Sequence, residues 1–577
     1  MNTANTLSNL KKDLIHAVRL AIARPLWSAA IVGTLALGIG LNTAVFSAVE
    51  AMLLRPLAGV QKPQEVVQIY RAFPGERFGS LSVPDMFDLR DRTDHLFSGV
   101  AAWTFSPLSL TLGGEPTRVL GHLVSANYFD VLGVRPALGR LFLPEEDRGA
   151  LAHPVAVLSY STWQTRFGGD PEIVGRRVVV NGREMEIVGV ASRDFRGAMP
   201  MLEPTLWVPL MQLDQIRPGS EGALLARNTR FMNGIARLAP GIDKPQADER
   251  IGAVMAAMRE AFPEIYEETE FHLIRQSEAG IHPSFRNAQV ALSGVVLAVG
   301  SLLLLIACVN VANLFLARAR DRSREVAVRL ALGASRGRIA RQMLTESLFF
   351  SLVASGVGLL VAHGVMKLAA RITVVGLDFT PGLALNPRVL LFALGTTVLA
   401  ALLAGVMPAR QSVRASLVPA LKGEHGFGVS GSRLRRTLVV AQMALSIVLL
   451  VASGLFLGNL RAAHRLDKGF QVEQRLVAGL DPSLQGYSRP QTEAFFRQLE
   501  ERLRRDSRVR SVAFVDTLPL SIGGSDRGIS VPGYEEKPGE RMSIHYNIVS
   551  PGSFAALGIS LLRGEDFSIA DTEPSDP

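Results

Sequence analysis

One short segment of the chain carries side chains suited to recognising another protein; it reads EVAVRLALGASRGRIARQMLTES, residues 325–347. Glu325 and Arg329 stand four residues apart, so on a helix they form a favourable ion pair on one face. Valine, leucine and alanine at helical spacing occupy the adjacent face, so the predicted helix is amphipathic. The chemistry that this pattern supports is binding rather than covalent catalysis.

The predicted helix ends within the same segment. Gly333 suits the left-handed position after a helix, and Ser335 can cap the next helix, which runs into a strongly apolar sequence. Small residues at this corner leave room for another backbone to approach closely. The alternative is a basic anchor that only fixes the orientation of the chain in a membrane. The candidate partner-binding residues are Glu325, Val326, Arg329, Leu330, Leu332, Gly333, Ala334 and Ser335.

Motifs for catalysis and metal binding are missing from the sequence. It contains no Gly-Lys dipeptide and therefore no phosphate-binding P-loop, and no Leu-Ser-Gly-Gly-Gln signature. It also lacks His-Glu-x-x-His and Cys-x-x-Cys, the usual zinc-ligand spacings. His153 and Asp147 lie in an acidic sequence that we interpret as a solvated loop, and Cys308 is the only cysteine, so no disulfide can form within the chain. We therefore expect no catalytic residue, no metal site and no cofactor bound by this chain.

The chain of 577 residues is 48% hydrophobic and 20% charged, a mixture that predicts membrane spans alternating with polar domains. Five apolar stretches reach the roughly 20 residues that cross a bilayer, and their cores contain no Asp, Glu, Lys or Arg. Carriers coupled to protons or sodium usually need carboxylates there, so that class is disfavoured. In the fifth span, Gly454 and Gly458 either pack closely on another helix or face lipid by coincidence. The predicted spans are Trp27–Val49, Val290–Leu316, Ser347–Val365, Val389–Met407 and Leu438–Leu460.

Basic residues indicate how the chain is oriented. Arginine and lysine gather near the N-terminus, in residues 317–344 and in residues 410–436. By the positive-inside rule these three regions are cytoplasmic, which places residues of about 51–287 and those after about 461 outside. The net charge of +9 thus reports orientation, and we expect no nucleic-acid partner. Residues 1–26 predict an amphipathic helix at the membrane interface, with apolar Leu10, Leu14, Ala17, Val18 and Ala21 on one face.

The first outer segment combines signals for strands and helices. Asn181-Gly182 stands between two β-rich runs and predicts a hairpin with a type I′ turn. Ser82 and Pro84 predict the start of one helix, and Pro245 the start of a longer one. The segment is therefore expected to fold as an α+β domain.

The second outer segment repeats parts of the first. Ser125–Phe142 aligns without a gap with Ser550–Phe567, matching Ser, Phe, Leu-Gly, Gly and Phe. Earlier in the second segment, Arg475–Leu480 and Val509–Val515 are expected to be strands on either side of a helix, as in the first copy. The spacing is about 410–425 residues in both comparisons, which predicts an internal duplication. Because the sequence reaches Pro577 inside this second copy, we expect that copy to be incomplete.

These patterns predict a membrane α-helical protein with five transmembrane helices and two extracytoplasmic α+β domains, the second incomplete. A Gly- and Ser-rich stretch between the copies predicts a flexible linker. The expected division of the chain is an interfacial helix at 1–26, a first span at 27–50, an outer domain at 51–287, a three-span permease region at 288–422, a linker at 423–436, a fifth span at 437–460 and a second outer domain at 461–577.

Several motifs together resemble the MacB/FtsX-like family of ABC transporter permeases. REVAVRLALGASRGRIARQMLTES is similar to the coupling segment of that family, with its Glu-x-x-x-Arg and Leu-Gly-Ala pattern intact. ACVNVANLFLARARDRSRE and PARQSVRASLVPALK are also family-like, and the duplicated order, with LGVRPALGRLF and PTLWVPL, is similar to the acidobacterial-type duplicated permeases.

The resemblance implies a permease of the bacterial inner membrane, with a cytoplasmic N-terminus, that docks on a separate cytoplasmic ABC ATPase. ATP would be used by that partner, whose cycle would reach the outer domains by mechanotransmission, in export or efflux. Membrane lipid and a periplasmic or outer-membrane protein are the other expected partners. The alternative is a non-transporting interaction or signalling protein that relays the state of the ATPase to a periplasmic partner such as a cell-wall hydrolase.

Overall fold

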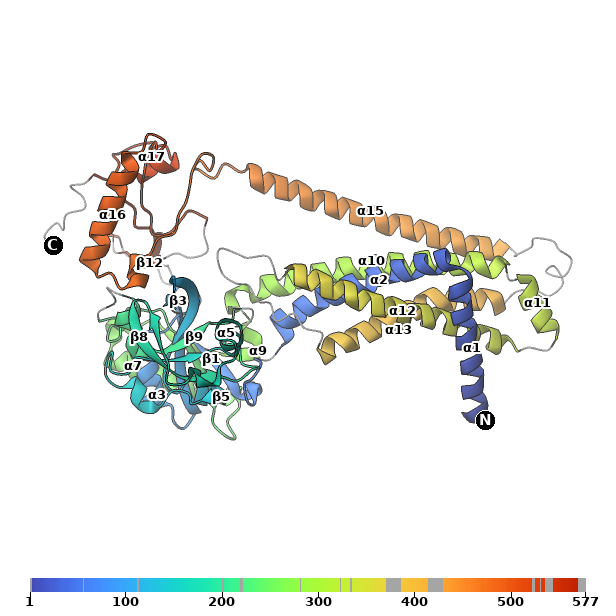
Figure 1. Cartoon of the computed structure of the whole chain (residues 1–577), viewed down its shortest axis with the longest axis horizontal. Helices are drawn as coiled ribbons and strands as arrows, with labels where there is room; N and C mark the ends of the chain where they lie inside the picture. Colours follow the sequence, from blue (N-terminus) through green and yellow to red (C-terminus); the bar gives the residue numbers. More distant parts are fainter. Residues whose placement is uncertain are drawn as a thin grey trace. The chain divides into compact units, whose positions relative to one another are not determined.

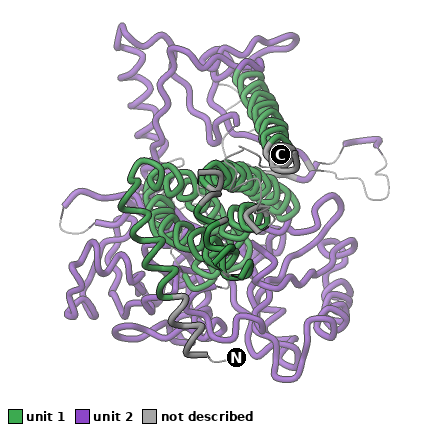
Figure 2. The backbone as a smooth tube through the Cα atoms, turned by 90° about the vertical axis from the view of Figure 1, so that its right-hand side faces the viewer, with its two compact units in different colours: residues 1–55, 285–464 green, residues 56–284, 465–577 purple. Residues whose placement is uncertain are grey.

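The chain forms two compact units in a computed structural model (Figure 2). Unit 1 comprises residues 1–55 and 285–464, and unit 2 comprises residues 56–284 and 465–577. The structure describes residues 3–55, 57–111, 114–199, 202–217, 220, 222–280, 282–321, 323–332, 335–369, 386–413, 429–520, 525–529, 531–534 and 543–568. The predicted short outer loop after the third span and residues 414–428 of the basic loop and linker lie outside these ranges.

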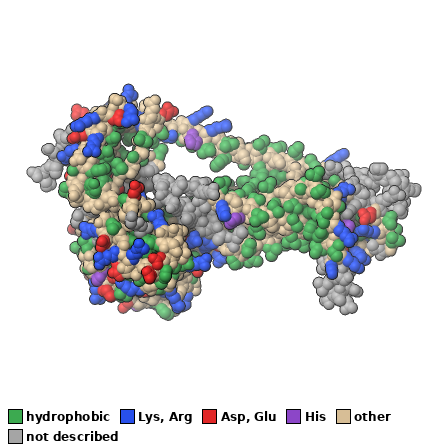
Figure 3. All heavy atoms as spheres, viewed as in Figure 1, with side chains coloured by type: hydrophobic (Ala, Val, Ile, Leu, Met, Phe, Trp, Pro, Cys, Tyr) green, Lys and Arg blue, Asp and Glu red, His purple; other side chains and the backbone are tan. Residues whose placement is uncertain are grey.

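In the described part of unit 1, five helices are long and apolar enough to cross a membrane, and each contains one predicted span, which confirms all five predicted stretches as candidate spans. Residues 429–436 of the predicted linker are helical, because the fifth helix begins well before its apolar core. Many exposed hydrophobic side chains lie along these helices on the face that Figure 3 shows. The helices are α2 (Pro25–Val49), continued by the π-helical turn η1 (Glu50–Leu54), α10 (Arg286–Asp321), α12 (Arg336–Ala369), α13 (Pro387–Val413) and α15 (Val429–Arg465).

The interior of unit 1 is an apolar core to which α2, α10, α12 and α13 all contribute. Its members include Leu35 of α2, Cys308 of α10 and Phe350 of α12. The indole of Trp27 packs edge-on against Phe350, with 5.4 Å between ring centroids. Within the described residues, α15 buries little, since only 6% of its most apolar window lies inside the structure.

The first part of unit 2 is an eleven-stranded mixed sheet, which we call the sheet domain (residues 57–284). Its main path runs β11-β1-β10-β3-β4-β9-β6-β8-β5, with β2 beside β1 and β7 between β3 and β8. The strands are β1 (Val66–Phe73), β2 (Glu76–Gly79), β3 (Phe97–Thr111), β4 (Thr117–Val124), β5 (Pro136–Gly139), β6 (Val155–Leu158), β7 (Arg177–Val180), β8 (Arg183–Ala191), β9 (Leu206–Pro209), β10 (Asn233–Leu238) and β11 (Glu270–Arg275).

Part of this sheet closes on itself. The pairings β3–β4, β4–β9, β9–β6, β6–β8, β8–β7 and β7–β3 form a ring. The fifteen residues of β3 make this closure feasible, because its first half pairs with β10 while its last residues pair with β7. Closure removes unpaired strand edges from this half of the domain.

The local predictions for the sheet domain are confirmed. Asn181 and Gly182 both have positive φ, 49° and 76°, and they join β7 to β8 as a type I′ turn requires. Ser82 caps α3 (Val83–Arg92) in a capping box with Asp85. Asp243 caps α7 (Lys244–Ala261) and Pro245 occupies its first turn. Side chains from α3 and α7 join one apolar core against the sheet, and α4 (Tyr128–Leu132) joins a second core.

The second segment of unit 2, residues 465–568, reproduces the backbone contacts of the aligned stretch. Ser125 N donates to Ala102 O and Ser125 Oγ accepts from Ala102 N, and Ser550 makes both bonds with Phe514. The bridge between Val515 and Val549 corresponds in register to the Trp103–Val124 pair of β3 and β4. The two stretches therefore share a local structure. The elements here are η7 (Pro482–Gln485), α16 (Arg489–Arg504), β12 (Ser525–Gly528), β13 (Ser543–Tyr546) and α17 (Ser553–Leu557).

The strands expected in the second segment differ from the prediction. Arg475–Leu480 is not a strand, and Val509–Val515 contributes only the single bridge at Val515. The first-copy counterpart of Arg475–Leu480 is β1, which pairs with β10 and β11 from more than 150 residues further along the chain. Among the described residues the second segment has no counterpart of these two strands, so the extended backbone has nothing with which to form a ladder.

Candidate coupling site

The start of the predicted coupling segment forms a separate short helix, α11 (Ser323–Ala331), between α10 and α12. Arg329 Nη2 lies 2.5 Å from Glu325 Oε1, which is the predicted i,i+4 ion pair. Ser335 directly precedes α12, and Arg338 N donates to its carbonyl at 3.0 Å and approaches its Oγ at 3.4 Å. Gly333 and Ala334 lie outside the described residues, so the predicted left-handed cap stays a prediction.

The apolar side chains of α11 and of Leu332, the residue that follows it, divide into an inner and an outer set. Leu332 is 83% exposed and Val328 is 44% exposed. Val326 is only 8% exposed and Leu330 is half-buried. Val326 is thus buried in this structure, and its predicted contact with a partner stays a prediction. Val328, which the sequence reasoning omitted, joins Leu332 on the accessible side.

A chain of polar contacts leads from α11 into the base of α12. Arg329 Nη1 donates to Gln342 Oε1 at 3.2 Å, and Gln342 Nε2 donates to Glu346 Oε1 at 3.3 Å. Glu346 is buried, at 4% exposure. One helical turn separates Gln342 from Glu346, so both point along the same face of α12. A displacement of Arg329 would thus act directly on α12 through these hydrogen bonds.

The same face of α12 holds the N-terminal helix α1 (Thr3–Ala23). Arg341 Nε lies 3.0 Å from Asp13 Oδ2, and His16 Nε2 lies 3.5 Å from Glu346 Oε1. Ala17 is fully buried, which corrects its predicted place on a lipid-facing surface, whereas Leu14 and Val18 are exposed as that prediction required. Helices α1, α11 and the start of α12 therefore form one connected cluster.

The two glycines predicted to pack in the fifth span have no neighbour among the described residues. An added Cβ at Gly454 or Gly458 would meet no atom within 4 Å, so their packing role stays a prediction. Close backbone packing occurs instead between α2 and α12, where a Cβ on Gly40 would lie 2.6 Å from Gly358 O. Small residues four apart, Ala36 with Gly40 and Ala354 with Gly358, were the sequence signal for this contact.

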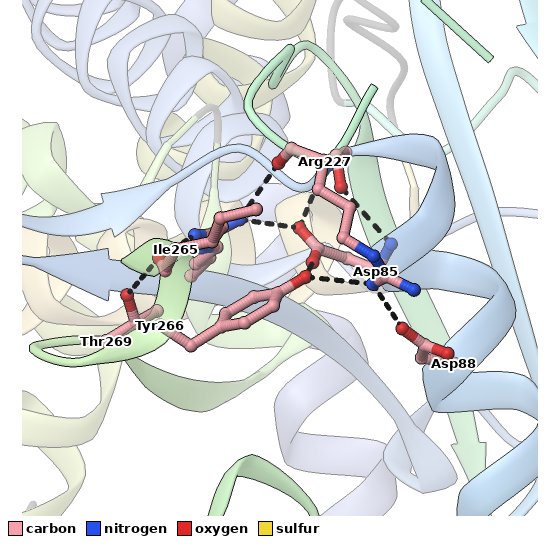
Figure 4. Close-up of polar contacts among 8 residues, drawn as sticks. Asp85, Asp88, Arg227, Ile265, Tyr266 and Thr269 are labelled. Atoms are coloured by element: carbon pink, nitrogen blue, oxygen red, sulfur yellow. Dashed lines mark hydrogen bonds and ion pairs between the residues drawn. The ribbon is translucent and has the colours of Figure 1, made fainter. Parts of the chain in front are cut away.

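A second polar cluster lies in the sheet domain and has a structural role (Figure 4). Arg71 Nη1 pairs with Asp85 Oδ2 at 3.2 Å, and both side chains are almost fully buried. Tyr266 donates to the other oxygen of Asp85, and Arg227 donates to Tyr266 at 3.2 Å while pairing with Asp88. Burial, reinforced by the charge of Asp85, raises the pKa of Tyr266. Each carboxylate is thus neutralised by an arginine, an arrangement that joins α3 to α8 (Pro263–Tyr266) rather than one that performs chemistry.

Other residues considered for chemistry are also explained by structure. Asp147 Oδ1 accepts from the backbone N–H of Ala126 at 2.9 Å, and burial raises the pKa of this carboxyl. Within the described ranges, no three His, Cys, Asp or Glu side chains gather closely enough to hold a metal ion.

Two family models match different parts of the chain. Residues 28–254 match the MacB-like periplasmic core domain, and residues 297–417 match the FtsX-like permease C-terminal domain. The chain belongs to the MacB/FtsX-like family of ABC permeases. It is therefore a multi-pass membrane protein, and α11 falls inside the permease domain of that family.

Relatives of this MacB/FtsX-like permease include named exporters. The chain is 25% identical over 431 residues to the macrolide export ATP-binding/permease protein MacB of Azoarcus sp., a match that covers 73% of this chain and 59% of that protein. It is 26% identical over 302 residues to the MacB of Chromobacterium violaceum, covering 52% and 43%. It is 25% identical over 300 residues to the pyoverdine export ATP-binding/permease protein PvdT of Pseudomonas syringae pv. tomato, covering 50% and 40%. The chain spans about half the length of the curated relatives it matches.

The solved structure of the periplasmic region of MacB from Actinobacillus actinomycetemcomitans resembles part of the chain. The match has a TM-score of 0.28 and 16% sequence identity, and it covers 38% of this chain and 91% of that structure.

Proposed function

We propose that this chain is the membrane subunit of an export ABC system whose ATP is hydrolysed by a separate ATPase. The observation that carries the proposal is α11 itself, a short helix that presents Leu332 and Val328 outward and is tied to α12 through Arg329 and Gln342. The relatives named above combine ATP-binding and permease functions, whereas this sequence has no Gly-Lys dipeptide and so no P-loop. An ATPase supplied by another chain reconciles the two facts.

In this proposal the ATPase receives α11 in an apolar groove on the cytoplasmic side of the bacterial inner membrane. The basic residues around α11 and near the N-terminus favour that side. Closure of the ATPase displaces α11, the Arg329–Gln342–Glu346 contacts pass the displacement to α12, and the outer domains respond by mechanotransmission. The transported substrate would be engaged outside the membrane, with a periplasmic or outer-membrane protein as a further partner.

A charge at the outer tip of α11 tests the docking surface. Leu332→Glu would place an unpaired carboxylate in an apolar contact, which costs several kcal/mol and weakens ATPase binding by more than roughly a hundredfold. The measurement is pull-down of the cognate ATPase by the full chain in detergent. Leu225→Glu is the matched control, because Leu225 of the sheet domain is 84% exposed and Leu332 is 83% exposed. Equal ATPase capture by the two variants would make α11 a topological anchor only.

Orientation has its own test. Reporter fusions at about residues 200, 330 and 500 should read outside, inside and outside the membrane, as the basic residues predict. A cytoplasmic reading at residue 200 would contradict the proposed orientation.

The alternative function is a relay that binds the ATPase without moving a substrate. Such a relay would give the same results in the pull-down and in the reporter fusions. It is distinguished by substrate accumulation in vesicles that contain chain and ATPase, which only the exporter produces.

A further inference from the structure

The surface of α1 divides into three strips along the helix. The first faces the bundle and contains Asp13, Ala17 and Leu20, all buried. The second is apolar and exposed, with Leu14, Val18 and Ile22 at 47%, 39% and 76% exposure. These three residues are four apart and so stack on one face. Such a stripe on an otherwise packed helix calls for an apolar neighbour.

The third strip is basic. Lys12 and Arg19 are exposed and seven residues apart, so they share one edge beside the apolar stripe. Lys11 and Arg24 are exposed as well, and the one described acidic residue of α1, Asp13, is already paired with Arg341. An exposed apolar stripe bordered by unbalanced positive charge complements a bilayer surface that carries anionic headgroups.

The orientation of α1 is also compatible with a bilayer surface as its neighbour. Within unit 1, α1 lies across the direction of α2, α10, α12 and α13, at the end of the bundle where α11 also lies (Figure 1). If the bundle helices cross the membrane, a helix in this position lies along the membrane surface. That the surface is the cytoplasmic leaflet rests on the proposed function.

We propose that the exposed face of α1 binds anionic phospholipid, and that its contacts with α12 make lipid binding stabilise the position of α11. The link from α1 to α11 depends on the continuity of the contacts between them. His16 approaches the same Oε1 of Glu346 that accepts from Gln342, and Gln342 accepts from Arg329 of α11. Lipid that holds α1 against α12 therefore restrains the groups that hold α11.

Hydrogen exchange on the full chain in nanodiscs tests the proposal without any ATPase. Nanodiscs of phosphatidylcholine are compared with nanodiscs that also contain phosphatidylglycerol, each holding one copy of the chain. Each basic residue near an anionic surface contributes roughly fivefold in affinity, so two give more than about tenfold. We expect phosphatidylglycerol to slow exchange of residues 11–23 by about tenfold, and exchange of residues 323–331 by a smaller factor.

Two variants separate the steps. The double variant Lys12→Gln, Arg19→Gln should lose both responses, whereas Gln342→Leu should keep the response of α1 and lose that of α11. The matched control is Arg92→Gln, Arg183→Gln, which removes two exposed charges from the sheet domain and should leave both responses intact.

Equal exchange of α1 in the two lipids would overturn the lipid site, and an unchanged α11 response in Gln342→Leu would overturn the link. Protection of α1 that needs two copies per nanodisc, whatever the lipid, would instead assign the stripe to a second chain. Because no ATPase is present, failure of the Leu332→Glu test leaves these outcomes unaffected.

Discussion

The two outer stretches, Ser125–Phe142 and Ser550–Phe567, have the same local contacts in different surroundings. Gly133 and Gly558 both end a short helix in the left-handed conformation, at φ 65° and 70°. Phe129 meets Phe142 at 5.6 Å between ring centroids, and Phe554 meets Phe567 at 6.0 Å. Yet Phe142 is 4% exposed and Phe567 is 53% exposed. The local sequence therefore specifies the turn, while burial depends on the rest of the sheet.

One arginine shows how the second stretch accommodates the difference. In the sheet domain, Arg237 of β10 donates from Nε to Val131 O at 2.7 Å. At the corresponding carbonyl, Ala556 O, the donor is Nε of Arg475, also at 2.7 Å. Gln61 N donates to Leu132 O and Gln471 N donates to Leu557 O, a register in which Arg475 corresponds to Glu65, the ion-pair partner of Arg237. A side chain of the second segment thus makes the bond that a neighbouring strand makes in the first.

The largest expected contrast is between Phe142→Ala and Phe567→Ala. Truncating the buried ring should lower the local free energy of unfolding by about 3–5 kcal/mol, because it leaves a cavity, and truncating the exposed ring by less than about 1 kcal/mol. Native-state hydrogen exchange at Leu132 and Leu557 reads both effects in the same chain. Similar losses would mean that the second segment is as well packed as the first.

Lowering the pH should reduce the difference in stability between the sheet domain and the second segment, because the sheet domain contains a buried histidine. Burial lowers the pKa of His122 to about 3, whereas the only histidine of the second segment, His545, is exposed. Below pH 6.5 the unfolded chain binds a proton that folded His122 does not, so stability falls as pH drops toward 3. We expect the sheet domain to lose about 2–3 kcal/mol between pH 7 and 4.5 from this residue. His122→Gln should remove that part of the pH dependence, and an unchanged slope would contradict the assignment.

Serine substitution should give a smaller contrast. Ser125 is fully buried, so Ser125→Ala leaves the N–H of Ala102 without its partner and should cost about 1–3 kcal/mol. Ser550 is only half-buried, and water can replace its Oγ, so Ser550→Ala should cost less than about 1 kcal/mol. The measurement is exchange of the Ala102 and Phe514 amides. A larger effect at Phe514 than at Ala102 would be the contrary result.

The smallest contrast is expected at the two glycines. Gly133→Ala and Gly558→Ala each place a side chain in the left-handed region, at a cost of about 1–2 kcal/mol. At Gly133 the new Cβ would also lie 2.8 Å from Gln61 Cβ, whereas at Gly558 it meets the ends of Arg475 and Gln471, which can move. We expect Gly133→Ala to be the more costly by about 1 kcal/mol, and thermal unfolding followed by exchange would show the order.

The sequence predicted what short-range chemistry decides. The five spans, the Asn181-Gly182 turn and the capped starts of α3 and α7 all depend on neighbouring residues, and all were correct. The ring of strands could not be foreseen, because β3 pairs with three strands, β4, β7 and β10, that come from separate parts of the chain. The strand predicted at Arg475–Leu480 failed for the same reason, since a strand also needs a neighbour.

At the candidate site, the sequence could not predict the directions in which the side chains point. Helical spacing placed Val326 and Leu330 on an apolar face, and the Glu325–Arg329 pair was correct. Spacing alone could not show that Val326 points into its own chain while Val328 points out, because that depends on where α10 and α12 lie. Gln342 and Glu346 escaped notice because their role is defined only by Arg329 and α1, which approach from elsewhere in the sequence.

The glycine contact between α2 and α12 affects how a movement could pass through unit 1. Gly358 and Gly40 let two backbones touch, so there are no interlocked side chains at that point to resist rotation of one helix against the other. The crossing can then act as a fulcrum, and a small tilt of α12 at its α11 end becomes an opposite swing at its other end. If an ATPase docks on α11 as proposed, spin-label distances across α2 and α12 should respond to it, and Gly358→Leu should abolish that response by blocking the fulcrum.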